Sequence, residues 1–207
     1  MSQADPAPTR RVPIHRRTID IEAFDAPEHL ELVCYFLDER PWAASEHHVV
    51  HQMELEVDVR KADLVITRAE ARMVRFPHTE CPDITPKFGE LVGVSIARGY
   101  NRAVQERFIG IAGCTHLEFM ARALGPAVVQ AAQSAKGYER ITSGAAPRDI
   151  VVTPFMRNTC HVWRDGGPAM DKIDAGWRPG LGGFPVPTVV EIRRLVQEQQ
   201  SQHESQP

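Results

Sequence analysis

Four side chains with reactive groups lie within one short stretch of the sequence, namely Cys114, Thr115, His116 and Glu118. The order Thr-His-Leu-Glu is typical of a helix start, where the threonine hydroxyl and the glutamate carboxylate satisfy free backbone amides. Cys114 occupies the position that packs against Phe119 in a hydrophobic staple, so the thiol also has a structural explanation. His116 is the one of these four residues that has no expected role in capping the helix, so it is the candidate for chemistry.

His116 is predicted in the first turn of this helix. The positive end of the helix dipole lowers the pKa of an imidazole there, which favours the neutral form. A neutral imidazole serves as a general base or as a hydrogen-bond donor to developing negative charge. The sequence therefore predicts His116 as a catalytic base or electrophile. A helix start whose histidine faces solvent is the structural alternative.

A second histidine, His51, stands in an alternating stretch that predicts a long strand. Its neighbours on the same side of that strand are all apolar, namely Val49, Met53, Leu55, Val57 and Val59. An imidazole on such a face needs a hydrogen-bond partner. It either makes a local hydrogen bond in the core or projects from the sheet into an enclosed pocket. We expect the second arrangement, with His51 as the acid/base partner of His116.

Weaker candidates would orient the substrate. Tyr100 and Arg102 stand at a predicted junction between a strand and a helix, where a phenol and a guanidinium can bind a substrate's polar end. We assign Tyr100 a catalytic role and Arg102 a binding role, with a structural tyrosine and a surface arginine as the alternatives. Thr115 and Cys114 are predicted to contact the substrate. A covalent role for Cys114 is a further alternative, because a histidine follows it two residues later.

Composition argues against several classes of function. The 207 residues are 43% hydrophobic, which is enough for a packed core, and the formal net charge of −3 without a long basic run argues against nucleic-acid binding. No apolar run approaches the roughly 20 residues that cross a bilayer, and the N-terminus lacks an apolar signal core. We therefore expect a cytoplasmic protein without a membrane partner. Its four cysteines form no C-x-x-C pair and are expected to be buried free thiols.

Motifs for cofactors and for common nucleophiles are missing from the sequence. The glycines of GWRPGLGG do not follow a strand and open a helix, and neither a Walker-type Gly-Lys-Ser/Thr nor a G-x-S-x-G elbow occurs. We therefore expect no cofactor and no metal. The alternative is a metal site in which His51 and His116 converge with a third ligand such as Cys160, His161 or Asp165.

Two periods of apolar residues predict an α+β fold. Strand-like patterns cover residues 16–24 and 30–37 and continue into a long antiparallel hairpin of residues 49–59 and 64–74. In the last strand alternate residues are expected to face the apolar side, namely Val65, Thr67, Ala69, Ala71 and Met73. Helical periods dominate after Pro77, so we expect an antiparallel sheet packed against helices from the second half of the chain.

Cap residues predict where these helices begin. Asn101 and Thr115 are expected to start two of them, with a break or kink at Gly125-Pro126, and a short strand is expected near residues 159–163. Thr188 begins a capping box that opens a terminal helix.

The expected division of the chain has three parts. Residues 1–13 form a mobile tail, residues 14–184 a single α+β domain, and residues 185–207 a C-terminal amphipathic helix and tail. The terminal helix is expected to dock on the domain or on a partner subunit.

Several short motifs resemble a bacterial domain family of unknown function, number 2889. They are His51-Gln52-Met53 on the long strand, Cys81-Pro82, Gly113-Cys114-Thr115-His116-Leu117 and Cys160-His161. The resemblance spans about residues 13 to 163, and the Gly-Cys-Thr-His-Leu segment is its most specific part. It implies a soluble bacterial protein and no particular activity. It points to His51 and His116 with Cys114 and Cys160 beside them, so Cys160 joins the predicted substrate site.

These observations predict a cofactor-independent acid/base enzyme, that is, a lyase, isomerase or decarboxylase. Its expected substrate is a small apolar acid or phenol, with aromatic compounds included, which would place the protein in aromatic compound catabolism. One alternative is a non-catalytic module whose sheet face holds an apolar ligand and whose terminal helix forms a homodimer. Another is a metal-dependent enzyme that uses His51 and His116.

Overall fold

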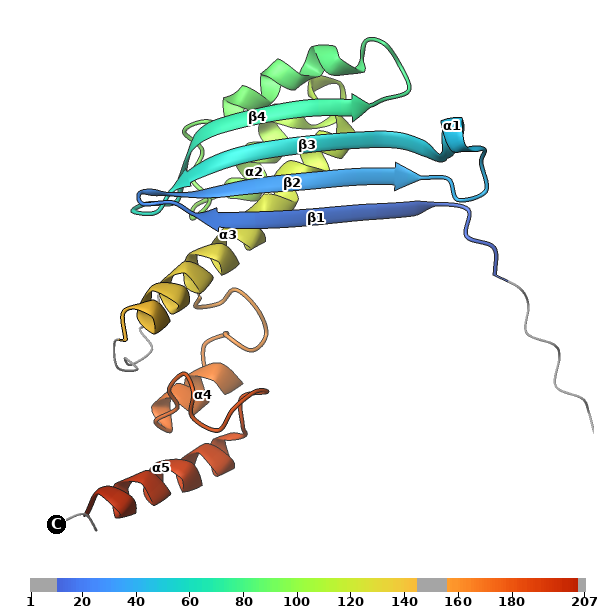
Figure 1. Ribbon diagram of the computed structural model, residues 1–207. Helices are drawn as coiled ribbons and strands as arrows, with labels where there is room; N and C mark the ends of the chain where they lie inside the picture. Colours follow the sequence, from blue (N-terminus) through green and yellow to red (C-terminus); the bar gives the residue numbers. More distant parts are fainter. Residues whose placement is uncertain (1–10, 145–155, 205–207) are drawn as a thin grey trace, which may run out of the picture. The chain divides into compact units, whose positions relative to one another are not determined.

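A computed structural model describes residues 11–144 and 156–204, with side chains through Ser201. The chain divides into two compact units, Met1–Ala135 and Lys136–Pro207. The first unit contains the whole sheet and the helical segments that pack on it, the last of which continues past Ala135 (Figure 1). The boundary expected between residues 184 and 185 stays a prediction.

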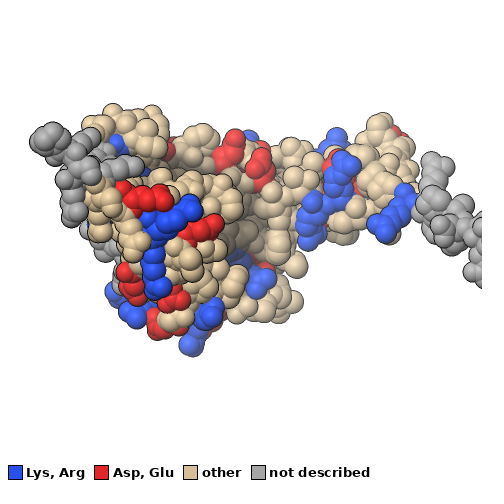
Figure 2. Space-filling view, turned by 90° about the horizontal axis from the view of Figure 1, so that it is seen from below, with Lys and Arg blue, Asp and Glu red and all other residues tan. Residues whose placement is uncertain are grey.

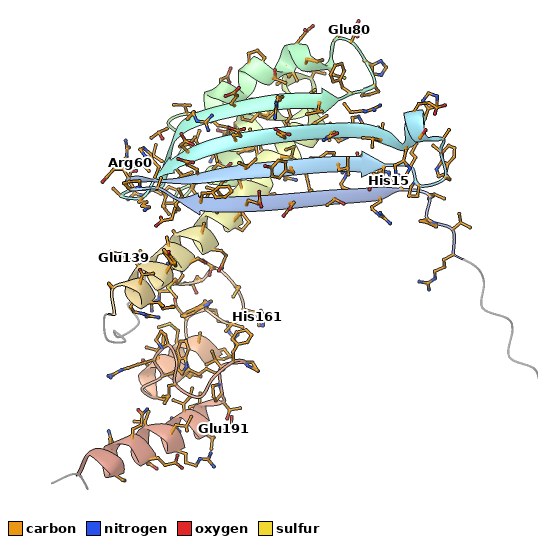
Figure 3. The ribbon with its side chains drawn as sticks, in the orientation of Figure 1. His15, Arg60, Glu80, Glu139, His161 and Glu191 are labelled. Atoms are coloured by element: carbon orange, nitrogen blue, oxygen red, sulfur yellow. The ribbon has the colours of Figure 1, made fainter. Side chains whose placement is uncertain are left out.

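Four antiparallel strands form the sheet, and their spatial order follows the chain. They are β1 (Arg16–Asp25), β2 (His29–Glu39), β3 (Val49–Arg60) and β4 (Val65–Arg75). A one-turn helix, α1 (Ser45–His48), lies between β2 and β3. Figure 3 labels His15 beside one end of the sheet and Arg60 at the other. The predicted α+β class is confirmed.

One face of the sheet carries the core, because apolar side chains alternate with polar ones along the central strands. The elements that cover this face follow β4, namely η1 (Cys81–Leu91), α2 (Tyr100–Phe108), η2 (Gly110–Ala112) and α3 (Thr115–Thr142) (Figure 1). Phe88 of η1 stacks on Phe108 of α2 with ring centroids 4.4 Å apart. The result is a closed layer of helices over the inner face.

The opposite face of the sheet is charged and solvated. Arg68 pairs with Asp58 and Glu56 across the hairpin, and Arg72 pairs with Glu54. Figure 2 shows acidic and basic side chains mixed on the face that it displays. Within residues 11–144 and 156–204 no helix combines the length and the apolar character needed to cross a membrane.

The expected facing of β4 is only partly right. Ala69 and Ala71 are partly buried against the core and Met73 is buried, as the alternation predicts. A register shift between Asp58 and Val59 changes the phase nearer the turn, so that Ile66 is the core residue there in place of its neighbours. Such a bulge adds one unpaired residue, which alternation in the sequence does not reveal.

The helix starts differ from the predicted caps. α2 begins at Tyr100 rather than after Asn101, because Gly99 has φ 64° and forms the N-cap. At α3 the carbonyl of Cys114 accepts from the amide of Glu118 at 2.8 Å, so the thiol-bearing residue is the N-cap. Glu118 pairs with Arg122 at 3.1 Å and does not reach back. The capping box predicted at Thr115 is therefore wrong.

Of the break or kink predicted at Gly125-Pro126, the break is wrong, because α3 continues through both residues. The glycine is a packing requirement, since a Cβ there would lie 2.8 Å from Cδ1 of Tyr100. Tyr100 also donates to the carbonyl of Ala121 at 2.7 Å, one turn earlier in α3. These contacts attach α2 to α3, and α3 carries His116 in its first turn.

The second unit contains α4 (Pro168–Asp174) and α5 (Val189–Glu204). The capping box at the start of α5 is confirmed, because the amide of Thr188 donates to Glu191 at 2.8 Å and the amide of Glu191 donates to the threonine hydroxyl at 3.4 Å. The strand predicted near residues 159–163 is wrong. That stretch forms turns, held by a hydrogen bond from the amide of Trp163 to the carbonyl of Cys160.

Replacing Val57 by alanine tests whether the inner face holds the fold. Val57 is fully buried on β3, whereas Val92 is half exposed, so the same substitution at Val92 is a matched control. We expect Val57→Ala to lower the free energy of unfolding by about 2 kcal/mol, and Val92→Ala by less than about 0.5 kcal/mol. Urea denaturation measures both values. Equal losses would contradict the assigned core.

Candidate functional site

Three residues form one row across the inner face of the sheet. The strand register places Arg17 of β1 opposite Asp38 of β2, and Asp38 opposite His51 of β3. Directly opposed residues in an antiparallel sheet point to the same face, so their side chains can meet. The register shifts immediately after this row, between Asp38 and Glu39.

Asp38 is the centre of the row and is only 2% exposed. Arg17 binds both of its carboxylate oxygens, with Nε at 2.7 Å from Oδ1 and Nη2 at 2.8 Å from Oδ2. His15, just before β1, places Nε2 3.3 Å from Oδ1. A buried carboxylate that is held by a guanidinium fork has a fixed orientation.

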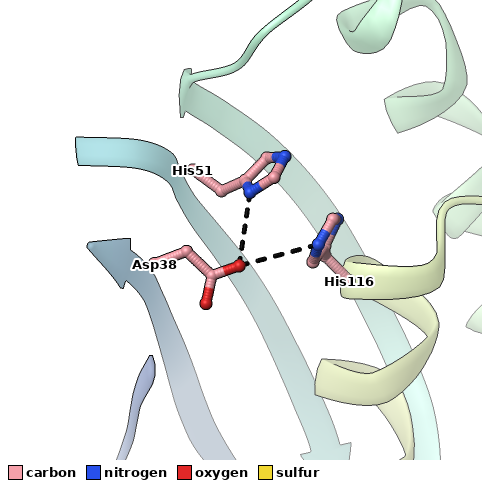
Figure 4. A group of neighbouring side chains, drawn as sticks. All are labelled: Asp38, His51 and His116. Carbon is pink, nitrogen blue, oxygen red and sulfur yellow. Dashed lines mark hydrogen bonds and ion pairs between the residues drawn. The ribbon is translucent and has the colours of Figure 1, made fainter. Parts of the chain in front are cut away.

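Two imidazoles face the other side of this carboxylate (Figure 4). Nδ1 of His51 lies 3.2 Å from Oδ2 of Asp38, and Nε2 of His116 lies 3.7 Å from the same oxygen. The ring centroids of the two histidines are 4.0 Å apart. The convergence expected of His51 and His116 is therefore present, and a carboxylate that the sequence analysis did not select lies between them.

The charges of the site favour an ionised Asp38. Burial alone would raise the pKa of this carboxyl group, but the hydrogen bonds and charge of Arg17, with support from His15 and His116, hold the pKa below its usual value. The same contact raises the pKa of the Arg17 guanidinium. The fork therefore joins two ions rather than a neutral acid and a base.

His116 is biased toward the neutral imidazole. Burial lowers its pKa, His51 and Arg17 lower it further, and Asp38 opposes the shift. The direction is the one that the sequence predicts, although desolvation is the largest cause rather than the helix dipole. The exposed fraction of the His116 side chain is 23%, so solvent still reaches the ring.

Further contacts hold the imidazole of His116 in place. Phe36 meets the ring edge to face at 5.3 Å between centroids, and the guanidinium of Arg17 lies 4.8 Å from the centroid of Phe36. On the other side, Sγ of Cys114 lies 3.8 Å from Nδ1. Cys114 is the N-cap of α3 and His116 stands in its first turn, so the start of this helix brings the thiol into contact with the imidazole.

A second histidine pairs with a carboxylate near the first. Nε2 of His48 lies 3.0 Å from Oε1 of Glu39, and Nη1 of Arg16 lies 3.8 Å from Oε2. Arg16 and Glu39 are opposite each other, one position outside the Asp38 row on β1 and β2, and His48 is the last residue of α1. Since no third possible metal ligand joins this pair among the described residues, His48 is a suitable comparison for His51.

The structure gives the two other polar candidates contacts of their own. Tyr100 is buried, donates to the carbonyl of Ala121, and has its pKa raised by burial. Arg102 is 84% exposed and pairs with Glu106 one turn further along α2. Both contacts are structural, and neither residue has a contact with Asp38 among the described residues. Their roles toward a substrate stay predictions.

The predicted substrate-contacting residues fall in two places. Cys114 belongs to the site through its contact with His116, and Thr115 is exposed beside it. Cys160 is an exposed free thiol of the second unit, so the expectation that all four cysteines are buried is wrong. Of the third metal ligands considered from the sequence, Asp165 pairs instead with Arg157 and Asn158.

Sequence reasoning missed Asp38, Arg17 and His15. A signal for the first was present, because β2 alternates apolar residues at Leu30, Leu32, Cys34 and Phe36 and the next residue of that parity is Asp38. A carboxylate on a buried phase requires a counter-charge. Arg17 lies on the same side of β1 as the partly buried Ile19 and Ile21. Its partner depends on how β1 and β2 are aligned, which a single sequence does not define.

The three convergent groups also match a metal-ligand set. One atom each from Asp38, His51 and His116 lies within 4.8 Å of the others. In the described part of the chain, this is the cluster in which three possible metal ligands converge. The arrangement can therefore do two things chemically. It can pass protons between two imidazoles and a substrate, or it can hold one cation.

A family model described as a protein of unknown function (DUF2889) matches residues 15–130. The match is more than half of the chain and includes every residue of the site, from His15 to His116. The chain matches no curated protein and no solved structure.

Substitution of Arg17 tests whether its fork compensates the buried carboxylate. We expect Arg17→Gln to lower the free energy of unfolding by about 1–3 kcal/mol, because Asp38 then keeps a charge without its cation. Arg72→Gln removes an ion pair on the solvated face and is expected to cost much less, because solvent screens exposed ion pairs. Adding Asp38→Asn to Arg17→Gln should recover part of the loss. Urea denaturation at pH 7 measures all four proteins, and similar losses for the two arginines would contradict this reading.

The lowered pKa of His116 predicts a pH dependence of stability. When the pH falls below the ordinary histidine pKa of about 6.5, the unfolded chain binds a proton that folded His116 resists. The folded state then loses free energy relative to the unfolded state until the pH reaches the lower pKa of the folded protein. We measure the free energy of unfolding by urea denaturation with a chelator present. Between about pH 7.5 and 5 we expect this free energy to fall less in His116→Gln than in the wild type. Parallel curves would contradict the shift.

Proposed function

Since the chain belongs to the family of proteins of unknown function DUF2889, whose description gives no activity, we propose a function from the site itself. It is an enzyme for acid/base chemistry, of the lyase, isomerase or decarboxylase type. The observation that carries the proposal is the pair of imidazoles, 4.0 Å apart, that face one buried carboxylate. Two proton-transferring groups at this separation can act on one small molecule.

The roles of the residues follow from their contacts. Asp38 accepts a hydrogen bond from Nδ1 of His51 when that nitrogen is protonated, which leaves Nε2 as the proton acceptor. His116 is the second proton-transferring group, held between Phe36 and Cys114. Arg17 is a positioning residue, because it acts by fixing the carboxylate.

The substrate class in this proposal is a small apolar acid or phenol, with aromatic compounds included. Support comes from the mostly buried side chains of His51 and His116 and from the apolar ring of Phe36, which packs against His116. A substrate of this kind would place the protein in the catabolism of aromatic compounds. We also propose that the protein acts in the cytoplasm. We further propose a homodimer formed through α5, since that helix exposes Val190.

Proton exchange tests the proposal without knowledge of the full reaction. Small carboxylic acids and phenols that raise the melting temperature are incubated with the protein in D₂O, and NMR follows deuterium entry at carbon. We expect exchange that falls by about 100-fold or more in His116→Gln and in His51→Gln. His48→Gln is the matched control and should keep the wild-type rate, because His48 pairs with Glu39 and not with Asp38.

A different result would support a binding module. If a ligand binds, exchange is absent, and the His51 and His116 variants bind it as well as the wild type, the acid/base function is wrong. The same outcome would favour the non-catalytic alternative predicted from the sequence.

A further inference from the structure

We infer that Asp38, His51 and His116 bind one divalent transition-metal ion. The inference goes beyond the proposed function, because a histidine nitrogen that binds the ion cannot also carry a proton, and the binding itself rests on the geometry alone. It departs from the expectation of a cofactor-independent enzyme, because the third ligand is a residue that the sequence analysis did not select.

The separations of the three donor atoms fit one ion. Oδ2 of Asp38 lies 3.2 Å from Nδ1 of His51 and 3.7 Å from Nε2 of His116, and all three atoms lie within 4.8 Å of one another. Ligand atoms at about 2.0–2.1 Å from a tetrahedral ion are about 3.4 Å apart. Two of the separations are close to this value, and small side-chain rotations would bring the histidines together.

Three different elements supply these ligands, so backbone structure fixes their approach. Asp38 ends β2, His51 begins β3 opposite it, and His116 stands in the first turn of α3. All three side chains are less than one quarter exposed. The neighbouring pair of Glu39 and His48 has similar chemistry but no third ligand within residues 11–144 and 156–204, which makes it a poorer site for an ion of this kind.

The donor set selects the class of metal. Two imidazole nitrogens and one carboxylate oxygen suit Zn²⁺, Fe²⁺ and Co²⁺, whereas Ca²⁺ and Mg²⁺ prefer oxygen ligands. Three protein ligands leave at least one coordination position for water or substrate, as in catalytic rather than structural sites. A metal held here supplies a Lewis acid beside the apolar surroundings of the site.

Arg17 is compatible with the ion as an outer partner. It donates to both oxygens of Asp38. The hydrogen bond from Nε goes to Oδ1, whereas the contacts of His51 and His116 are with Oδ2. A carboxylate has about four lone-pair positions, so Oδ2 can bind an ion and still accept from Nη2 of Arg17, while Oδ1 keeps the hydrogen bond from Nε. Hydrogen bonds from such outer partners orient metal ligands.

Metal content gives the first test. Protein purified without chelator, and with any histidine tag removed, is analysed for zinc, iron, cobalt, nickel and manganese. Metal-free protein is then titrated with Co²⁺, whose visible spectrum reports nitrogen and oxygen coordination, and with Zn²⁺ by calorimetry. We expect one equivalent per chain for the wild type.

Ligand variants give the second test. Asp38→Asn, His51→Gln and His116→Gln are expected to weaken Co²⁺ binding by more than about 100-fold, beyond the effect typical of an outer partner. His48→Gln and Glu39→Gln are the matched controls and should bind as the wild type does. Circular dichroism confirms that each variant folds. Absence of stoichiometric binding by the wild type, or binding that the three ligand variants leave unchanged, would overturn the inference.

The two proposals fail in different ways. Proton exchange by metal-free protein, with no stoichiometric metal bound, would overturn the metal site and leave the acid/base function standing. Stoichiometric binding that requires all three ligands, without exchange in either the metal-free or the zinc-loaded protein, would establish the metal site and reject the acid/base function.

Discussion

Burial of the Asp38 carboxylate is the constraint on which the site depends. An isolated ionised carboxylate in an apolar interior is strongly unfavourable unless it is paired and hydrogen-bonded. Here the sheet register supplies Arg17 on one side and His51 on the other. The guanidinium fork keeps the group ionised, and the ionised group in turn orients the imidazoles. Each polar residue of the row therefore explains the conformation of the next.

The remaining structure brings a fourth group to this row. α3 begins beside the end of the sheet, and its first turn carries His116 to within 3.7 Å of Oδ2. The helix is held there by its buried side chains and by the contacts of Tyr100 with Ala121 and Gly125. Tyr100 thus serves the site at a distance, since it attaches α2 to the helix that presents the imidazole. A rigid layer of this kind limits how far the histidine rings can separate.

The sequence contained enough to find half of this site. Alternation placed His51 on the buried face of β3, and the helix-start pattern identified His116, because both signals are local. Asp38 also lay on a buried phase, but the meaning of that position depends on the residues opposite it, and strand register is a long-range property. The bulge that turns Ile66 instead of Thr67 toward the core could not be predicted for the same reason. The capping box at Thr188 was predictable, whereas the one at Thr115 failed because Cys114 is the N-cap.

The two chemistries of the cluster draw on the same lone pairs. An imidazole nitrogen that binds a metal ion is not available as a base, so His51 and His116 can be ligands or proton carriers but not both through one atom. The geometry leaves Nε2 of His51 and Nδ1 of His116 outside the convergent set, with the latter facing Cys114. A metal-loaded site would therefore leave proton transfer to groups bound at the ion's open positions. In both cases Asp38 is the common element, since it orients the imidazoles without a metal and completes the ligand set with one.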